Sequence, residues 1–88
     1  MVLLDVREPH EFAAGHLPHA INIPLARVSE AVQALPQDRD WMVICRSGGR
    51  SAQACEVLRV QLPGITLYNL QGGLLAWQRD VDESLIVV

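Results

Sequence analysis

The segment Cys45-Arg46-Ser47-Gly48-Gly49-Arg50 places one thiol beside two glycines and two arginines. It follows a short apolar run, Trp41–Ile44, and precedes a helical pattern that begins at Ser51. A glycine-containing loop can turn its backbone N–H groups inward and form an anion-binding nest. The N-terminus of the following helix adds partial positive charge, which lowers the pKa of a nearby thiol. The segment therefore predicts a nucleophilic Cys45 beside an oxyanion cradle.

The second thiol, Cys55, has a different context. It lies between Ala52 and Leu58 on the apolar face of a predicted helix, so we interpret it as a small hydrophobic core residue. The same interpretation would suit Cys45 if it stood alone, but the Arg-Ser-Gly-Gly-Arg-Ser sequence that follows Cys45 favours a functional role. A disulfide between the two cysteines is not expected, because the end of a strand and the middle of a helix diverge.

The elements that must position Cys45 alternate along the chain. Short apolar runs predict strands at residues 2–6, 20–23, 41–44 and 65–70. Helical periodicity and end signals predict helices at about 9–14, 25–35, 51–62 and 74–80. This alternation predicts an α/β fold, an open, mostly parallel sheet of about four to five strands flanked by helices. Sites in such sheets form at the carboxyl ends of the strands, which is where Cys45 falls.

Composition limits the possible classes of protein. The 88 residues suffice for one domain, so we expect residues 1–88 to form a single domain. The longest apolar run has about five residues and the start has no secretory pattern, so we expect no membrane association and a cytoplasmic location. The net charge of −3 argues against nucleic acid as a partner. The three scattered histidines show no zinc spacing, and we expect no metal and no cofactor.

With these motifs in order, the sequence resembles the rhodanese-like sulfurtransferases over nearly its whole length. Cys45–Ser51 is similar to the active-site loop of that family. Three further segments resemble its other motifs: Leu3–Glu8 with Glu11-Phe12, Gly15–Pro18 with Ala20–Pro24, and Gly72-Gly73 with Ala76-Trp77. The resemblance implies a single rhodanese-like domain in which Cys45 takes a sulfane sulfur from thiosulfate or another persulfide donor. Cys45 would carry it as a persulfide and pass it to a thiophilic acceptor, cyanide or a protein thiol.

The resemblance also implies roles for the loop. A persulfide anion needs hydrogen-bond donors and little steric bulk around it, which the backbone of Ser47, Gly48 and Gly49 would provide. Either Arg46 or Arg50 would hold the sulfonate end of the donor. We expect Arg46 to point toward substrate at the rim of the site and Arg50 to support the loop from its end.

Other residues are expected to support the site. Asp5 and Arg7 lie at the end of the first predicted strand, and a buried carboxylate there must be paired, so we interpret Asp5 as a structural acceptor. Ser51 stands at the head of the helix after the loop. His19 occupies a position where the family commonly has glycine, and we expect a positive φ there. Trp77 is interpreted as a core residue.

Two alternative functions remain open. The segment Ala76–Asp82 resembles the end of rhodanese domains fused behind ubiquitin-like-protein adenylyltransferases, which implies a sulfur-relay or interaction module in a molybdopterin or thiamin pathway. A phosphatase or arsenate reductase ranks lower. The related phosphatases carry Cys-x5-Arg, usually with histidine before the cysteine, whereas this chain has Cys-x4-Arg and Ile44. An inactive binding domain ranks lower still, because Cys45 is present.

The family pattern usually places one more strand and helix before the strand at Leu3–Arg7. Here that strand begins at the first residues, so the chain resembles a minimal or truncated rhodanese domain. Loss of an edge strand would expose the backbone of the strand at 65–68. We predict that the apolar tail Leu85–Val88 covers this edge, either from the same chain or from a second copy, which would give a homodimer.

Overall fold

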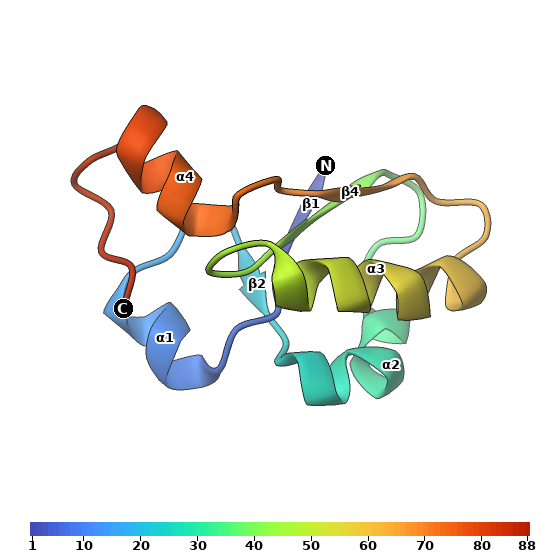
Figure 1. The fold of residues 1–88 in the computed structure, drawn as a ribbon. Helices are drawn as coiled ribbons and strands as arrows, with labels where there is room; N and C mark the ends of the chain where they lie inside the picture. Colours follow the sequence, from blue (N-terminus) through green and yellow to red (C-terminus); the bar gives the residue numbers. More distant parts are fainter.

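The computed structural model of the protein describes residues 1–88 and shows an α/β fold with one parallel sheet (Figure 1). The strands, in the spatial order β2-β1-β3-β4, are β1 (Val2–Asp5), β2 (Ile21–Asn22), β3 (Trp41–Ile44) and β4 (Leu67–Asn69). The helices are α1 (Pro9–Ala14), α2 (Val28–Ala31), α3 (Gly49–Gln61) and α4 (Gly73–Asp80). The predicted fold class is confirmed, with four strands.

The main core lies between the sheet and the helices α2 and α3. In β1 and β3, Leu4 pairs in register with Val43, and both side chains are fully buried on this side. Trp41 is also fully buried there, and its indole N–H donates to the carbonyl of Pro36 at 2.9 Å. Val28 of α2 packs into the same cluster. This core holds β3 in place, and it therefore fixes the position of Cys45, the residue that follows β3.

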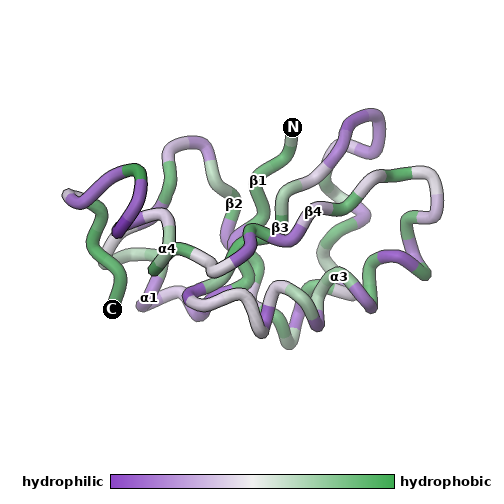
Figure 2. The backbone as a smooth tube through the Cα atoms, turned by 45° about the horizontal axis from the view of Figure 1, so that its top comes forward, coloured by the Kyte–Doolittle hydropathy of each residue, from purple (hydrophilic) through white to green (hydrophobic).

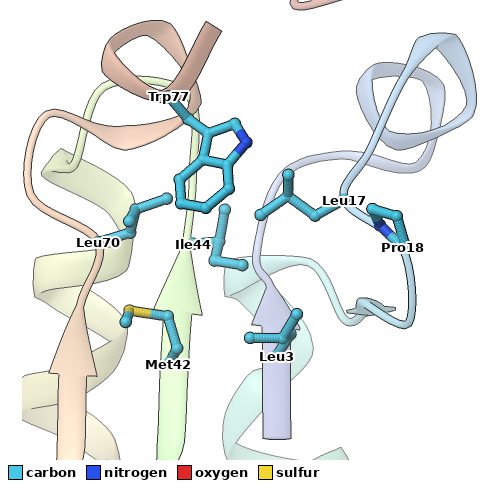
Figure 3. A pocket seen from close by; sticks show the side chains of 7 residues that line it. All are labelled: Leu3, Leu17, Pro18, Met42, Ile44, Leu70 and Trp77. Carbon is cyan, nitrogen blue, oxygen red and sulfur yellow. The ribbon is translucent and has the colours of Figure 1, made fainter. Parts of the chain in front are cut away.

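The opposite face of the sheet carries a smaller cluster beneath α4. Because side chains alternate along a strand, Ile44 points away from the main core and packs with Leu17, Leu74 and Leu85. Beside this cluster lies an open apolar pocket of about 240 Å³ (Figure 3). Its walls are Leu3, Leu17, Pro18, Met42, Ile44, Leu70 and Trp77. Trp77, which the sequence indicated as a core residue, is half-buried: it packs against this smaller cluster and also forms a wall of the pocket.

Two helix boundaries differ from the predictions. The single helix predicted over residues 25–35 is divided into a 3-10 turn at Leu25–Arg27, one turn of α-helix (α2) and a second 3-10 turn at Val32–Ala34. Helix α3 begins at Gly49 and not at Ser51, because Gly48 adopts φ 104° and turns the chain into the helix two residues earlier. The buried face of α3 is therefore Ser51, Ala54, Cys55 and Leu58, and Ala52 is only partly buried.

The prediction that the C-terminal tail covers the edge of β4 within the chain is wrong. β4 pairs only with β3, and its outer edge is unpaired. The tail instead leaves α4, reverses direction and runs toward α1 (Figure 1). It is hydrophobic at its end (Figure 2), and Leu85 finds a buried place in the cluster beneath α4, where Gln78 donates to the Leu85 carbonyl at 2.7 Å. A three-residue edge strand offers no comparable apolar site.

The predicted positive φ at His19 is confirmed, with a value of 69°. His19 lies in the turn before β2, and it is the only residue other than glycine with a positive φ. The helices of this protein are too short or too polar to cross a membrane.

Candidate active site

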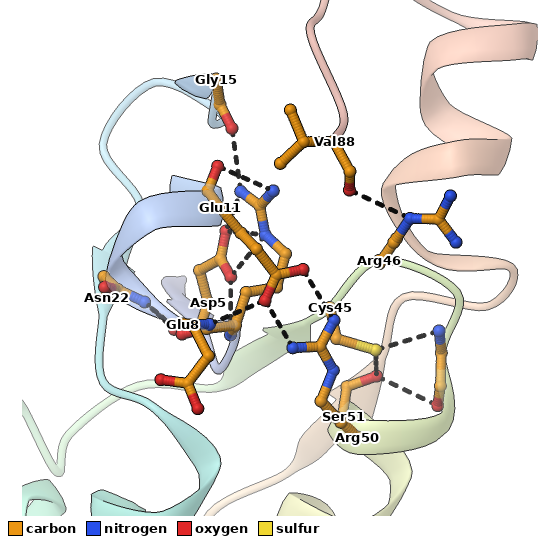
Figure 4. A network of polar contacts seen from close by, with 12 residues as sticks. Asp5, Glu8, Glu11, Gly15, Asn22, Cys45, Arg46, Arg50, Ser51 and Val88 are labelled. Carbon is orange, nitrogen blue, oxygen red and sulfur yellow. Dashed lines mark hydrogen bonds and ion pairs between the residues drawn. The ribbon is translucent and has the colours of Figure 1, made fainter. Parts of the chain in front are cut away.

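Cys45 lies directly after β3, where the chain leaves the sheet and turns through residues 46–48 into α3. The left-handed conformation of Gly48 directs its backbone N–H toward the thiol, and it donates to Cys45 Sγ at 3.0 Å. The Ser51 hydroxyl, one turn into α3, lies 3.3 Å from the same sulfur (Figure 4). Cys45 is only 1% exposed, so water competes little with these two contacts.

The electrostatics of the two thiols differ. Burial acts to raise the pKa of Cys45, but the hydrogen bonds of Ser51, Gly48 and Ser47 outweigh it and bring the pKa below its usual range. Burial raises the pKa of Cys55, with only a small opposing effect from Arg59. Both cysteines are free thiols. Cys45 is thus the thiol that ionises more readily, and Cys55 is an unreactive residue of the core.

Helix α4 holds the active-site loop from the second face of the sheet. The backbone N–H groups of Leu74 and Leu75 donate to the carbonyls of Cys45 and Arg46, at 2.9 and 3.0 Å. A Cβ atom on Gly73 would overlap the Arg46 carbonyl and lie 2.7 Å from the Cys45 carbonyl oxygen. Glycine is therefore required at this crossing, and the start of α4 fixes the loop backbone while the start of α3 supplies donors to the sulfur.

Arg50 lies at the end of the loop and pairs with Glu11 of α1. Its two terminal nitrogens donate to the two carboxylate oxygens of Glu11 at 2.7 and 3.0 Å (Figure 4). Glu11 also accepts the backbone N–H of Glu8 at 3.0 Å, so it closes the first turn of α1. The hydrogen bond from Arg50 overcomes the effect of burial and lowers the pKa of Glu11 to about 2.

Asp5, at the end of β1, pairs in register with Ile44, and neither Asp5 nor Arg7 makes a hydrogen bond to Cys45. Arg7 is fully buried and donates to both oxygens of Asp5, at distances between 2.7 and 3.1 Å. The Arg7 guanidinium also donates to the carbonyl of Glu11, within α1, and to that of Gly15, at the C-terminal cap of α1. Asp5 thus accepts from a buried arginine, and Arg7 links the end of β1 to α1.

Arg46 and Ser47 are exposed at the rim of the loop. The Nε of Arg46 donates to the backbone oxygen of Val88 at 3.0 Å, which ties the tail to the site. The two terminal nitrogens of Arg46 make no hydrogen bond to the protein and face solvent. Of the two loop arginines, Arg46 keeps both terminal nitrogens free for an anion, whereas both terminal nitrogens of Arg50 are bonded to Glu11.

Sequence reasoning did not select two residues of this site. Glu11 was noted only within a motif, although an acidic residue in the first turn of a helix was a signal for a role there. Asn69, the last residue of β4, accepts from the Ser51 hydroxyl and donates to the Gly48 carbonyl. Its signal was its place as a polar residue at the carboxyl end of a strand. No group of three or more His, Cys, Asp or Glu side chains is placed to bind a metal ion.

The fold and the site define a small α/β protein with one ionisable thiol in a backbone cradle at the carboxyl end of its central sheet. The family model described as "Rhodanese-like domain" matches residues 1–80. The chain belongs to the rhodanese-like domain family.

Relatives and solved structures agree with this assignment. A protein named sulfurtransferase from Allochromatium vinosum is 43% identical over 79 residues, which are 90% of this chain and 73% of that protein. "Adenylyltransferase and sulfurtransferase MOCS3" of Drosophila virilis is 40% identical over 90 residues, covering 94% of this chain but only 20% of the relative. The crystal structure of a rhodanese-related protein from Thermoplasma volcanium matches with a TM-score of 0.81 and 37% identity, over 99% of this chain and 82% of that one.

Proposed function

We propose that this protein is a sulfurtransferase that carries a sulfane sulfur on Cys45 between a donor such as thiosulfate and a thiophilic acceptor. The observation that supports this most directly is the environment of Sγ, which receives the Gly48 N–H at 3.0 Å and lies 3.3 Å from the Ser51 hydroxyl. A thiol with a lowered pKa in such a cradle is an activated nucleophile. The sulfurtransferase named among the relatives supports the same activity.

The transfer has two steps. The Cys45 thiolate attacks the outer sulfur of thiosulfate, a Cys45 S–S bond forms, and the S–S bond of thiosulfate breaks with its electron pair leaving on sulfite. Cyanide or an acceptor thiolate then attacks the outer sulfur of the persulfide. The new bond to the acceptor forms, the Cys45 S–S bond breaks, and its electron pair returns to Cys45 as a thiolate. No external oxidant or reductant is needed.

Each neighbour of Cys45 has a part in this scheme. Gly48 and Ser51 stabilise the thiolate that begins and ends the cycle. The free terminal nitrogens of Arg46 bind the sulfonate end of the donor. Arg50 keeps the loop closed through Glu11, and this pairing argues against a phosphatase, because it leaves fewer of the Arg50 N–H groups for a phosphate.

The test is the production of thiocyanate from thiosulfate and cyanide. We expect activity in the wild type and in Cys55→Ala, and none above background in Cys45→Ala. After incubation with thiosulfate alone, mass spectrometry should find one added sulfur atom on the peptide that contains Cys45. Equal rates in the wild type and in Cys45→Ala would refute the proposal.

A second candidate function is sulfur relay to a protein. The match to one fifth of a fused adenylyltransferase and sulfurtransferase supports it, and so does the exposed position of Arg46 and Ser47 at the rim. The sulfur would be used to form the C-terminal thiocarboxylate of a ubiquitin-like protein in a molybdopterin or thiamin pathway. Fast transfer from persulfidated Cys45 to such a protein, together with slow turnover of cyanide, would favour relay. The opposite pattern would favour a small-molecule enzyme.

We further propose that the protein acts in the cytoplasm.

We also propose that two copies of the protein associate through the unpaired edge of β4. The open edge supports self-association, because an unpaired strand offers free N–H and C=O groups to a second strand. Sedimentation equilibrium of the purified protein tests this, and a monomer at micromolar concentration would contradict it.

A further inference from the structure

The Ser51 hydroxyl lies at the centre of three hydrogen-bond contacts. Its oxygen is 3.3 Å from Cys45 Sγ, 3.2 Å from the Gly48 carbonyl and 2.5 Å from Asn69 Oδ1. A hydroxyl has a single proton to donate. Ser51 is fully buried, so this proton goes to one of these three neighbours and not to water.

The side chain of Asn69 is oriented by a second contact. Its Nδ2 donates to the Gly48 carbonyl at 3.2 Å. With the amide turned over, Oδ1 would face that carbonyl, and two acceptors would meet without a proton between them. The bond to Gly48 therefore keeps Oδ1 toward Ser51, where it acts as an acceptor.

Two arrangements of the Ser51 proton follow. While Cys45 is a neutral thiol, Ser51 donates to Asn69 and its oxygen can accept the S–H. Once Cys45 is ionised, the sulfur is the stronger acceptor, because hydrogen bonds to a charged acceptor are roughly twice as strong. The hydroxyl then has to turn from Asn69 to the sulfur, and the acceptor on Asn69 opposes that turn.

We propose that Asn69 is a positioning residue of the sulfur-transfer site, which competes with Cys45 for the proton of Ser51 and so sets how strongly the thiolate is hydrogen-bonded. The inference rests on the proposed function only in taking the thiolate as the reactive form. A thiolate with fewer hydrogen bonds is a stronger nucleophile. By drawing the Ser51 proton away from the sulfur, Asn69 thus lowers the fraction of Cys45 that is ionised and makes the thiolate that does form more reactive.

The experiment measures the rate of Cys45 alkylation by iodoacetamide as a function of pH, with the alkylated residue located by mass spectrometry. In Asn69→Ala the hydroxyl is released to the sulfur, and we expect the pKa of Cys45 to fall. At a pH below that pKa, a fall of about half a pKa unit gives about three times as much thiolate. Because the more strongly hydrogen-bonded thiolate is a weaker nucleophile, we expect the alkylation rate to rise about twofold. Asn69→Leu, which fills more of the same space without an acceptor, should shift the pKa in the same direction.

The double variant separates positioning from general support of the loop. Ser51→Ala should raise the pKa of Cys45, and adding Asn69→Ala to it should cause no further shift, because the competition acts through Ser51. An unchanged or raised pKa in both single variants of Asn69, or the same shift with and without Ser51, would overturn the inference. Alkylation needs no sulfur transfer. A protein that takes up no sulfur on Cys45 from thiosulfate and makes no thiocyanate, but shows this cycle, would therefore refute the proposed function and leave the role of Asn69 intact.

Discussion

Glu11 is the side chain that joins α1 to the active-site loop, since it binds Arg50 with two hydrogen bonds. Its own side chain is 11% exposed and that of Arg50 is 34% exposed, so water screens the pair only in part. Replacing one charge of such a pair leaves the other with weaker partners. At the scale of single residues, Glu11 is therefore the supporting position whose loss should be easiest to measure.

We expect Glu11→Gln to lower the free energy of unfolding by about 1–2 kcal/mol at pH 7, as for a partly buried charged hydrogen bond. Urea denaturation measures the change. The matched control is Glu56→Gln, at an exposed position of α3 without an ion pair, which should change stability by less than about 0.5 kcal/mol. Similar effects in the two variants would mean that the Glu11–Arg50 pair does not support the loop.

The same carboxylate gives a pH dependence. Its pKa falls from an ordinary value of 4.5 to about 2 in the folded protein, so folding favours the ionised form. The contribution of Glu11 to stability is complete above about pH 4.5 and is lost as the pH falls from there toward 2. The difference in stability between the wild type and Glu11→Gln should therefore be constant from pH 5 to 7 and decrease in more acidic solution. Urea titrations at several pH values measure it, and a difference that grows on acidification would contradict this assignment.

At the scale of elements, the site depends on the crossing of α4 over the active-site loop. Gly73 has φ 62°, and a Cβ there would overlap the Arg46 carbonyl. We expect Gly73→Ala to move α4 away from the loop and to lower the free energy of unfolding by more than about 2 kcal/mol. Thermal unfolding measures the loss. Gly64→Ala is the control, because nothing lies within 4 Å of a Cβ at that position. A Gly73→Ala variant as stable as this control would contradict the proposed crossing.

The elements also show what the sequence could predict. The cradle around Cys45 was predictable because it is local: the thiol, Gly48 and Ser51 fall within seven consecutive residues. Glu11 and Asn69 were not selected, because they reach the loop through the tertiary fold. Arg50 and Glu11 are separated by 39 positions in the chain, and Ser51 and Asn69 by 18. Nothing in the residues near Cys45 identifies such partners before the order of the strands is known.

The predicted helix over residues 25–35 and the predicted place of the tail were wrong for a different reason. The apolar period over residues 25–35 correctly placed Val28 and Val32 in the core. It could not distinguish one α-helix from a helical turn between two 3-10 turns, since both bury residues four apart. The position predicted for the C-terminal tail was wrong, because its apolar composition indicates that it is buried but does not indicate which part of the protein it packs against.

At the scale of the whole molecule, the C-terminal tail covers part of the sheet face that carries the smaller core cluster, beneath α4. Leu85 is buried with Ile44 and Leu74. The next residue, Ile86, lies so close to Gly15 that the Ile86 carbonyl would overlap a Cβ atom at position 15. The tail thereby connects α4, the loop before β2 and, through Val88, the rim of the active site.

This packing predicts that the tail contributes to global stability. Leu85→Ala removes a buried side chain, and we expect the free energy of unfolding to fall by about 2–3 kcal/mol, the lower part of the range for buried leucines, because the neighbouring pocket is open to water. Val60→Ala, at a side chain 83% exposed, is the control and should have little effect. Urea denaturation compares the two. If Leu85→Ala proves as stable as Val60→Ala, the tail is not part of the folded core, and the contact between Val88 and Arg46 would have no support from packing.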